Sequence, residues 1–288
     1  MNVSVELELR NTSFLPANIL RIIGAWLAVS RVRAQSVHLP DNIVQLFIAG
    51  SSIRGFSVHR RWAWFRNRVE VRLSVGASRG DWQAAYSFLR FALQQGFEAR
   101  SDDGGEMSAD SLTDESALQR GRAQFVVDVR VLQQLMASSG DEGVSLPNGR
   151  FAVPVKPSDL PSEPLGDEAV ESLQNVLQRR AARYAAARSA SIITLQSGAT
   201  AIVWSGEPLL APAVEYVVLS TGEFDPANCV FVPWERAVQE LADAVEKIQR
   251  TPAQYYFEAI AADESRWQQL VEAGAPIAQL GQRERPGR

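Results

Sequence analysis

The sequence is poor in the residues that build metal sites and disulfide frameworks. It has one cysteine and two histidines among 288 residues, which excludes an intramolecular disulfide and any cysteine-rich zinc or iron–sulfur site. Cys229 lies in the apolar segment Asn228–Val232, as is typical of a small buried hydrophobic side chain. His38 and His59 are too few to complete a histidine metal site. We therefore expect no metal and no cofactor.

Lysine and long apolar runs are also scarce. Lys156 and Lys247 are the only lysines, and the other basic side chains are arginines, a bias that we interpret as that of a GC-rich bacterial genome. The apolar run Ile22–Val29 is far shorter than the ~20 residues of a membrane-spanning helix. Residues Met1–Arg10 lack the basic start of a signal peptide. We expect a cytoplasmic protein that does not bind membranes.

What is present is ordinary globular composition. Hydrophobic residues make up 46% of the chain and charged residues 22%, enough apolar surface for a core. The formal net charge of −4 argues against attraction of the whole protein to nucleic acid. The length favours two domains. We predict an α+β fold with an N-terminal domain over 1–137, a Pro/Gly-rich linker over 138–166 and a C-terminal domain over 167–288, each a mostly antiparallel sheet with helices on one face.

Hydrophobic periodicity supports this fold class. Helices are predicted where apolar residues recur every three or four positions, over Pro16–Val29, Asp81–Gln95, Asp167–Arg188 and from Pro233 through Ile248. Strands are predicted where apolar residues alternate or form short runs, and these include Val3–Leu9, Ile43–Ile48, Ile53–Trp64, Arg68–Val75 and Phe125–Val129. The acidic segment Ser101–Glu115 predicts a mobile loop.

One motif suggests catalysis. Gly76-Ala77-Ser78-Arg79-Gly80 matches the G-x-S-x-G nucleophile elbow, in the expected setting between a strand and a helix. A Ser–His–Asp hydrolase needs a histidine base, and elbow families place it after the serine, but no histidine follows His59. The preceding strand alternates with charged residues, whereas an elbow strand is buried on both faces. We therefore favour an ordinary strand-to-helix turn.

Three short stretches resemble the patatin-like hydrolases, which use a Ser–Asp dyad. Gly50–Gly55 is similar to the oxyanion loop of that family, Gly76–Gly80 to its nucleophile motif and Asp103–Gly105 to its acid motif. The resemblance implies Ser78 as nucleophile and Asp103 as its partner. Two glycines of the family's oxyanion loop are serines here, and the family separates its serine and aspartate by a far longer segment. A serine hydrolase is the alternative enzymatic function.

A basic, aromatic hairpin is the other candidate site. Between Arg54 and Arg79, seven arginines accompany one acid, Glu70. Aromatic rings stack on bases and arginines bind phosphates, so the pattern also fits nucleic acid. We favour arginines on a solvated sheet face with the tryptophans buried beneath, which explains the pattern without a ligand. An acidic partner, either another protein or the segment Ser101–Glu115, is the next interpretation. The predicted binding residues are Arg54, Arg60, Arg61, Trp62, Trp64, Arg66, Arg68 and Arg72.

These observations predict a non-catalytic adaptor or accessory protein of a bacterial cytoplasm that binds another protein. The prediction follows from the missing catalytic groups. A serine hydrolase and a nucleic-acid-binding accessory protein are the alternatives. The sequence predicts neither the identity of the partner nor the oligomeric state.

Overall fold

A computed structural model shows a mixed α+β protein, which confirms the predicted fold class. It describes residues 5–11, 19–30, 34–39, 43–48, 50–63, 66–101, 104–139, 143–148, 150–161, 166–220, 229–248 and 253–276. It describes the backbone alone for residues 5–11, 19, 34–39, 60–63, 66–68 and 139.

Contacts divide the chain into two compact units, Met1–Arg183 and Tyr184–Arg288. The division falls within helix α4 (Asp167–Ala186) rather than in the segment 138–166, where we expected a linker. The described part of that segment contains a hairpin of two strands, β8 (Val144–Pro147) and β9 (Ala152–Val155). Proline and glycine suit the ends and turns of short strands as well as linkers.

The first unit is built on a seven-stranded antiparallel sheet with the order β2-β3-β4-β5-β1-β6-β7. Its strands are β1 (Val5–Asn11), β2 (Ala34–Leu39), β3 (Ile43–Ile48), β4 (Phe56–Ala63), β5 (Arg66–Leu73), β6 (Phe97–Ser101) and β7 (Glu106–Met107). Strand β1 lies between β5 and β6, so the beginning of the chain pairs with segments about sixty and ninety residues later. This arrangement brings charged residues of β1 beside those of β5.

The sheet has one apolar and one polar face, because side chains alternate along each strand. The core face includes the buried residues Val44, Leu46, Phe56, Val58, Val69, Val71 and Leu73. Side chains of alternate parity, such as Gln45, Ser57 and Arg72, are only partly buried. The alternation that predicted Arg68–Val75 as a half-buried strand holds for Val69, Val71, Leu73 and Arg72, whereas Glu70 on the polar face is buried as well.

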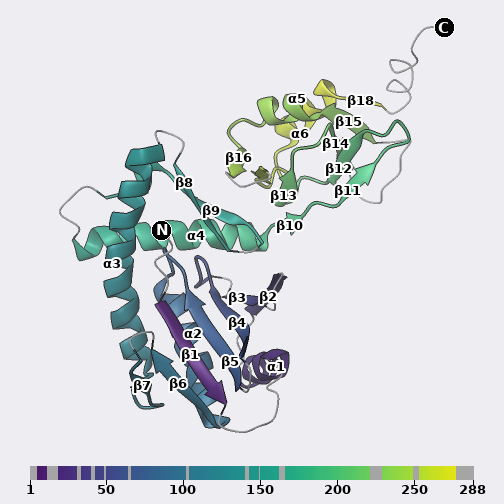
Figure 1. Ribbon diagram of the computed structural model, residues 1–288. Coiled ribbons are helices and arrows are strands. Elements are labelled where there is room, and N and C mark those ends of the chain that lie inside the picture. The colour runs from purple at the N-terminus through teal and green to yellow at the C-terminus, as the bar shows by residue number, and fades with distance from the viewer. Residues whose placement is uncertain are drawn as a thin grey trace. The chain divides into compact units, whose positions relative to one another are not determined.

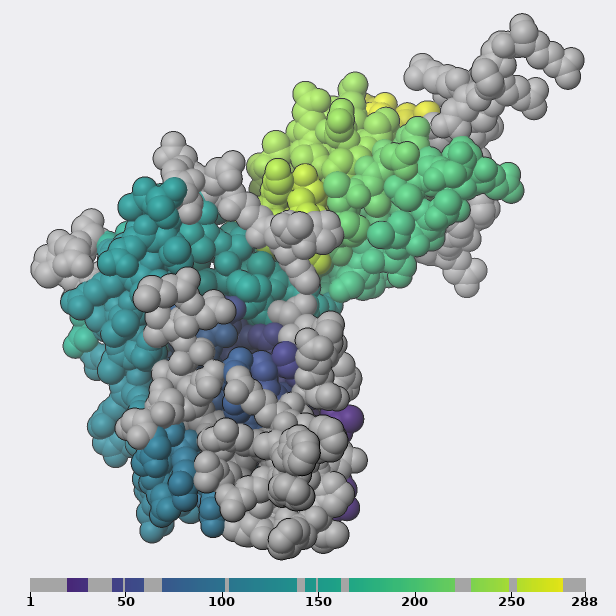
Figure 2. Space-filling view, viewed as in Figure 1, coloured from purple at the N-terminus to yellow at the C-terminus, as the bar shows by residue number. Residues whose placement is uncertain are grey.

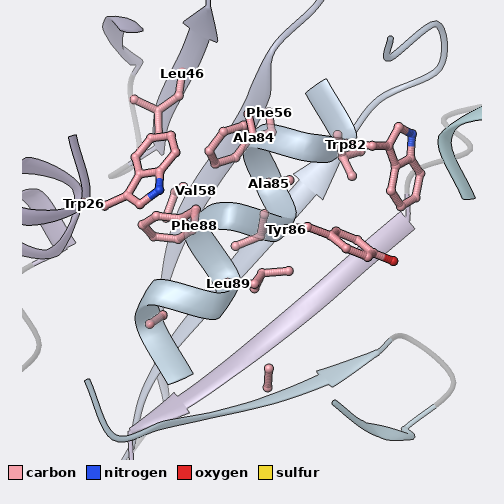
Figure 3. Packing of buried hydrophobic residues seen from close by; sticks show 14 of the residues in the cluster. Trp26, Leu46, Phe56, Val58, Trp82, Ala84, Ala85, Tyr86, Phe88 and Leu89 are labelled. Carbon is pink, nitrogen blue, oxygen red and sulfur yellow. The ribbon is translucent and has the colours of Figure 1, made fainter. Parts of the chain in front are cut away.

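Helices α1 (Ile19–Ser30) and α2 (Arg79–Gln94) cover the apolar face. Figure 3 shows Trp26 of α1 beside Leu46 and Phe56 of the sheet and Phe88 of α2. The ring centroids of Trp26 and Phe88 are 5.6 Å apart and the rings meet edge to face, a favoured aromatic geometry. None of the helices in the described ranges has the length and apolar character to cross a membrane.

Helix α3 (Asp114–Ser139) packs against α2, and the predicted strand Phe125–Val129 is wrong. These residues lie in the middle of α3. The run favours a strand locally because valine is β-branched. Its buried residues nevertheless follow helical spacing and continue along the helix as Ala117, Gly121, Phe125, Val129, Leu132 and Met136. Packing along this stripe outweighs the local preference, and α3 lies at the surface of the unit in Figure 2.

The acidic segment is also more ordered than expected, since its described residues include β7 and the start of α3 at Asp114.

Helix α4 runs across one end of the sheet (Figure 1). Its Gln178 side chain donates a 2.9 Å hydrogen bond to the Ser51 carbonyl. Its Arg180 forms a 2.7 Å ion pair with Asp159, in the short 3-10 helix η2 (Pro157–Asp159). These contacts fasten α4 to the loops of the first unit.

The second unit contains a four-stranded and a five-stranded sheet. The four-stranded sheet has the order β10 (Arg188–Ser189), β13 (Leu209–Pro212), β17 (Gln254–Phe257) and β16 (Val245–Ile248). The five-stranded sheet has the order β11 (Ile192–Thr194), β12 (Thr200–Trp204), β14 (Tyr216–Leu219), β15 (Val230–Pro233) and β18 (Ala275–Pro276). Helices α5 (Trp234–Glu240) and α6 (Glu264–Ala273) complete the unit, and Trp204, Trp234 and Phe257 pack together in its core.

The helix predicted from Pro233 through Ile248 is too long. Helix α5 ends at Glu240, and Val245–Ile248 forms strand β16, which pairs with β17. The apolar residues of this segment fit a helical period, but Val245 stands opposite Phe257 of β17, and a β-branched residue packs well opposite an aromatic one. The sequence did not predict β2 or β13, whose alternation is weak.

Candidate functional site

The β4–β5 hairpin extends beyond its neighbours in the sheet. Its strands pair over eight rungs that end at Ala63 opposite Arg66. Strand β3 pairs with β4 only as far as His59, and β1 pairs with β5 only as far as Arg68. Among the described strands, the rungs nearest the turn therefore have no neighbour on either side. We call residues 60–68 the arm.

The arm carries a dense positive charge. It contains four arginines, three aromatic residues and no acid. The arginines are Arg60, Arg61, Arg66 and Arg68. The side chains of the arm, including Trp62, lie outside the described residues, as does Trp64 entirely. What the structure adds is the pairing of the arm with the rest of the sheet.

The strand register aligns three arginines on adjacent strands. Arg61 of β4 stands opposite Arg68 of β5, and Arg68 stands opposite Arg10 of β1. Directly opposite residues share a face of the sheet, and like charges in these positions are destabilising. Glu98 of β6 is opposite Arg10 and ends this arginine row with one negative charge. The row therefore concentrates positive charge that an anionic group would neutralise.

Arg54, also predicted as a binding residue, makes contacts within the first unit that stabilise the fold. Its guanidinium donates 2.8 Å hydrogen bonds to the carbonyls of Val75 and Pro147. Burial lowers the pKa of Arg54 to about 10, although the nearby carboxylates of Asp81 and Asp128 favour its charged form. The side chain therefore remains positive at neutral pH and holds three loops together inside the first unit.

Arg72 lies at the base of the arm, where Glu70 neutralises its charge. Its Nη2 lies 2.7 Å from Oε2 of Glu70, a residue that is only 5% exposed. On the neighbouring strand, the Ser57 hydroxyl and His59 Nε2 are 2.8 Å apart. The register sets Ser57 opposite Arg72 and His59 opposite Glu70. This polar block offsets the charge of Arg72, so the excess positive charge of the hairpin belongs to the arm.

The acidic segment Ser101–Glu115 contacts arginines outside the arm. Glu106 lies 3.3 Å from Arg100 and Asp114 lies 2.8 Å from Arg90. These are the ion pairs that the described part of the segment shows. The idea that this segment covers the basic hairpin therefore gains no support from its described residues.

Ser78 of the G-x-S-x-G pattern is the N-cap of α2. It is fully buried, and its hydroxyl lies 2.7 Å from the Ser51 carbonyl and accepts a 3.1 Å hydrogen bond from the Asp81 amide. The hydroxyl also lies 3.0 Å from Oδ2 of Asp81. A nucleophile must however be exposed to its substrate, whereas this hydroxyl is enclosed and engaged in capping. Asp103, the other residue implied by the hydrolase resemblance, lies outside the described residues.

Packing explains both glycines of that pattern. Gly76 has a φ of +80°, which disfavours residues with a side chain. A Cβ at Gly80 would lie 2.4 Å from the Ser51 carbonyl oxygen, so a side chain there would push the β3–β4 loop away. The motif in this chain is thus accounted for by a tight turn and a close loop.

Asp81 is a central polar residue that sequence reasoning missed. Its carboxylate is fully buried and accepts hydrogen bonds from the backbone amides of Ile53, Arg54, Gly55 and Ser78. Ser78 and Asp81 together form a capping box, in which each side chain binds the other's amide. The S-x-x-D spacing was a readable signal for this arrangement.

Asp128 of α3 is a second buried carboxylate in this region. It accepts a 2.7 Å hydrogen bond from the Gly76 amide and a 2.9 Å bond from the Gln124 side chain. Burial raises the pKa of Asp128, while these hydrogen bonds and the charge of Arg54 oppose that rise. We call Arg54, Asp81 and Asp128 the polar hub, which joins the β3–β4 loop, the β5–α2 turn and α3.

Metal binding and thiol chemistry find little support in the residues that the structure describes. Within those ranges no three of His, Cys, Asp and Glu come together as metal ligands. Cys229 is a free, buried thiol, which agrees with its expected role as a small core residue. No protein-family model matches the chain, and neither a curated protein nor a solved structure does.

Proposed function

We propose that this chain is a non-catalytic binding protein, an adaptor or accessory factor, that contacts an acidic surface of another protein through the arm and the arginine row. The observation that carries the proposal is the register of Arg61, Arg68 and Arg10 on three adjacent strands. Aligned like charges lower the stability of an isolated sheet. An opposing carboxylate surface would relieve that repulsion and gain charge-assisted hydrogen bonds.

A protein partner fits better than nucleic acid for two reasons. The formal net charge of the whole chain is −4, so its long-range field repels a polyanion. The arginine row is also narrow, because Glu98 stands at one end and the Glu70–Arg72 pair lies beside it. An acidic patch of limited size on a protein matches a short row better than a continuous phosphate backbone does.

The sharpest test is Arg68→Glu, which converts the row from three like charges to alternating signs. We expect the first unit to become more stable, by up to about 1 kcal/mol, because opposite charges now face each other. We expect the affinity for the partner to fall at least about tenfold, which corresponds to ~1.4 kcal/mol. The partner is first isolated by purification of the tagged full chain from its native cell, and the affinity is then measured by calorimetry with both purified proteins.

Arg130→Glu is the matched control, because Arg130 is an exposed residue of α3 away from the sheet. It makes the same change of net charge and should leave the affinity unchanged. An unaltered affinity for the Arg68→Glu variant would remove the arginine row as the interface. Tight, steeply salt-dependent binding of RNA or DNA would instead favour a nucleic-acid function, and covalent labelling of Ser78 by a fluorophosphonate would favour a hydrolase.

A further inference from the structure

His59 is the last residue before the arm and lies on the same face of the sheet as the arginine row. It is two residues from Arg61 on β4, and residues with this spacing share a face at a distance of about 7 Å. Electrostatic interactions act over a Debye length of about 8 Å in physiological salt. A positive charge on His59 would therefore act on the same anionic surface as the arginine row.

The hydrogen-bonding partner of His59 on β4 is compatible with both charge states of the ring. The Ser57 hydroxyl and His59 Nε2 are 2.8 Å apart. A hydroxyl can donate a hydrogen bond to a neutral ring nitrogen and accept one from a protonated nitrogen. Both residues are half-buried, so His59 keeps some contact with water. The ring can therefore gain a proton without a change of the fold around it.

The strands on either side of β4 present one apolar and one acidic residue to His59. Ile43 of β3 and Glu70 of β5 stand directly opposite it. Oε2 of Glu70 accepts hydrogen bonds of 2.7 and 3.1 Å from the guanidinium of Arg72. Because Arg72 offsets the charge of Glu70, this carboxylate attracts a proton on His59 less strongly than an isolated carboxylate would.

The more distant charges on this face oppose one another. Arg61 and Arg68, which stand opposite each other, disfavour a positive charge on His59. Glu8 of β1 stands opposite Glu70 and favours that charge. An acidic surface bound to the arginine row would add further negative charge close to His59. Binding would then shift the ring toward its protonated form.

We propose that His59 is a proton-dependent binding residue, which strengthens the contact with an acidic partner as pH falls through the histidine range near about 6.5. The inference rests on the proposed function of the arm and adds its regulation. Protonation would add one positive charge to the four arginines of the arm. Linkage requires that a partner that favours the protonated ring is itself bound more tightly by the protonated protein. For a half-exposed site screened by water, we expect an affinity about three- to tenfold higher at about pH 5.5 than at about pH 8.

Titration of the full chain with an octaglutamate peptide, followed by NMR spectroscopy, tests the proposal. The peptide stays ionised above about pH 5, so a change of affinity between about pH 8 and pH 5.5 reports on the protein. The chain has two histidines, and their ring signals report the protonation of each one. We expect the peptide to raise the protonated fraction of His59 at about pH 6.5.

His59→Gln should bind the peptide at about pH 8 as tightly as the unmodified protein does, and it should lose the increase at low pH. His38→Gln is the matched control. His38 of β2 stands opposite Val44, a buried residue of the apolar face, so it lies on the other face of the sheet from the arginine row. This variant should keep the pH dependence, and melting temperatures of both variants check that they fold.

Three results would overturn the inference and leave the proposed function standing. They are peptide binding without pH dependence, a pH dependence that survives His59→Gln, and a protonated fraction of His59 that the peptide does not change. Absence of peptide binding at both pH values would overturn the proposed function together with this inference.

Discussion

Replacement of Asp81 by asparagine should strongly destabilise the first unit, because the carboxylate accepts from donors on both oxygens. Oδ1 accepts from the Gly55 amide at 2.9 Å, and Oδ2 accepts from the amides of Ile53, Arg54 and Ser78 at 2.7–3.2 Å. Asparagine has one acceptor oxygen, so in either orientation its NH2 group faces at least one backbone N–H. That amide would lose its partner inside the protein.

The expected cost follows from these contacts. A buried donor without a partner costs about 1–3 kcal/mol, and the remaining hydrogen bonds weaken when the charge is lost, for a total of about 3 kcal/mol. For a unit of this size that lowers the melting temperature by roughly 6–12 °C. This is a large share of a typical stability of about 5–15 kcal/mol.

The assay is hydrogen exchange of α2 amides in increasing urea, which reports on the first unit separately from the second. The matched control is Asp114→Asn, a change in the first turn of α3 at a side chain that is 66% exposed, where an exposed ion pair contributes less than about 1 kcal/mol. Equal effects of the two substitutions, or a loss below about 1 kcal/mol for Asp81→Asn, would refute the role given to the polar hub.

Two further predictions concern pH. Burial raises the folded-state pKa of Asp128, so the folded state releases this proton at a higher pH than the unfolded state does. The contribution of Asp128 to stability therefore falls as pH rises above about 4. Asp128→Asn should remove that decline in urea titrations of the first unit. For Asp159, burial raises the pKa but hydrogen bonds and the charge of Arg180 outweigh it, so the pKa is lowered. Its contribution is present above about pH 4 and lost as pH falls through the folded pKa, and Asp159→Asn should cost about 2–3 kcal/mol at pH 7 and abolish this acid dependence.

Local patterns predicted the fold class and several elements. The alternation of Arg68–Val75 and the spacing in Asp81–Gln95 correspond to β5 and α2, because burial on one face imposes those periods. Phe125–Val129 was assigned to a strand because the run is too short to reveal the helical stripe that continues to either side. Strands in which apolar and polar residues alternate only weakly, such as β2, could not be predicted from a local pattern.

The candidate site depended on pairing that no local pattern contains. Arg61 and Arg68 lie close in the sequence, but Arg10 joins them only because β1 is inserted beside β5. Arg54 was grouped with the arm by sequence proximity, yet it belongs to the polar hub, where its partner Pro147 is 93 positions away. Ser78 was readable as a cap from Asp81 three residues later. The burial that separates capping from catalysis required the three-dimensional structure.

The polar hub also has a consequence for synthesis of the chain. Its bonds join residues across the whole first unit, since Gly76 and Asp128 are 52 positions apart and the neighbouring bond from Gln178 to Ser51 spans 127. A ribosome releases these segments in order, so the β5–α2 turn emerges long before the residues that complete its hydrogen bonds. Until α4 has left the exit tunnel, the nascent unit lacks the contact from Gln178. The first unit therefore completes its contacts late in translation. A chain truncated before α4 would stay incompletely folded, and chaperones and proteases would have access to it for longer.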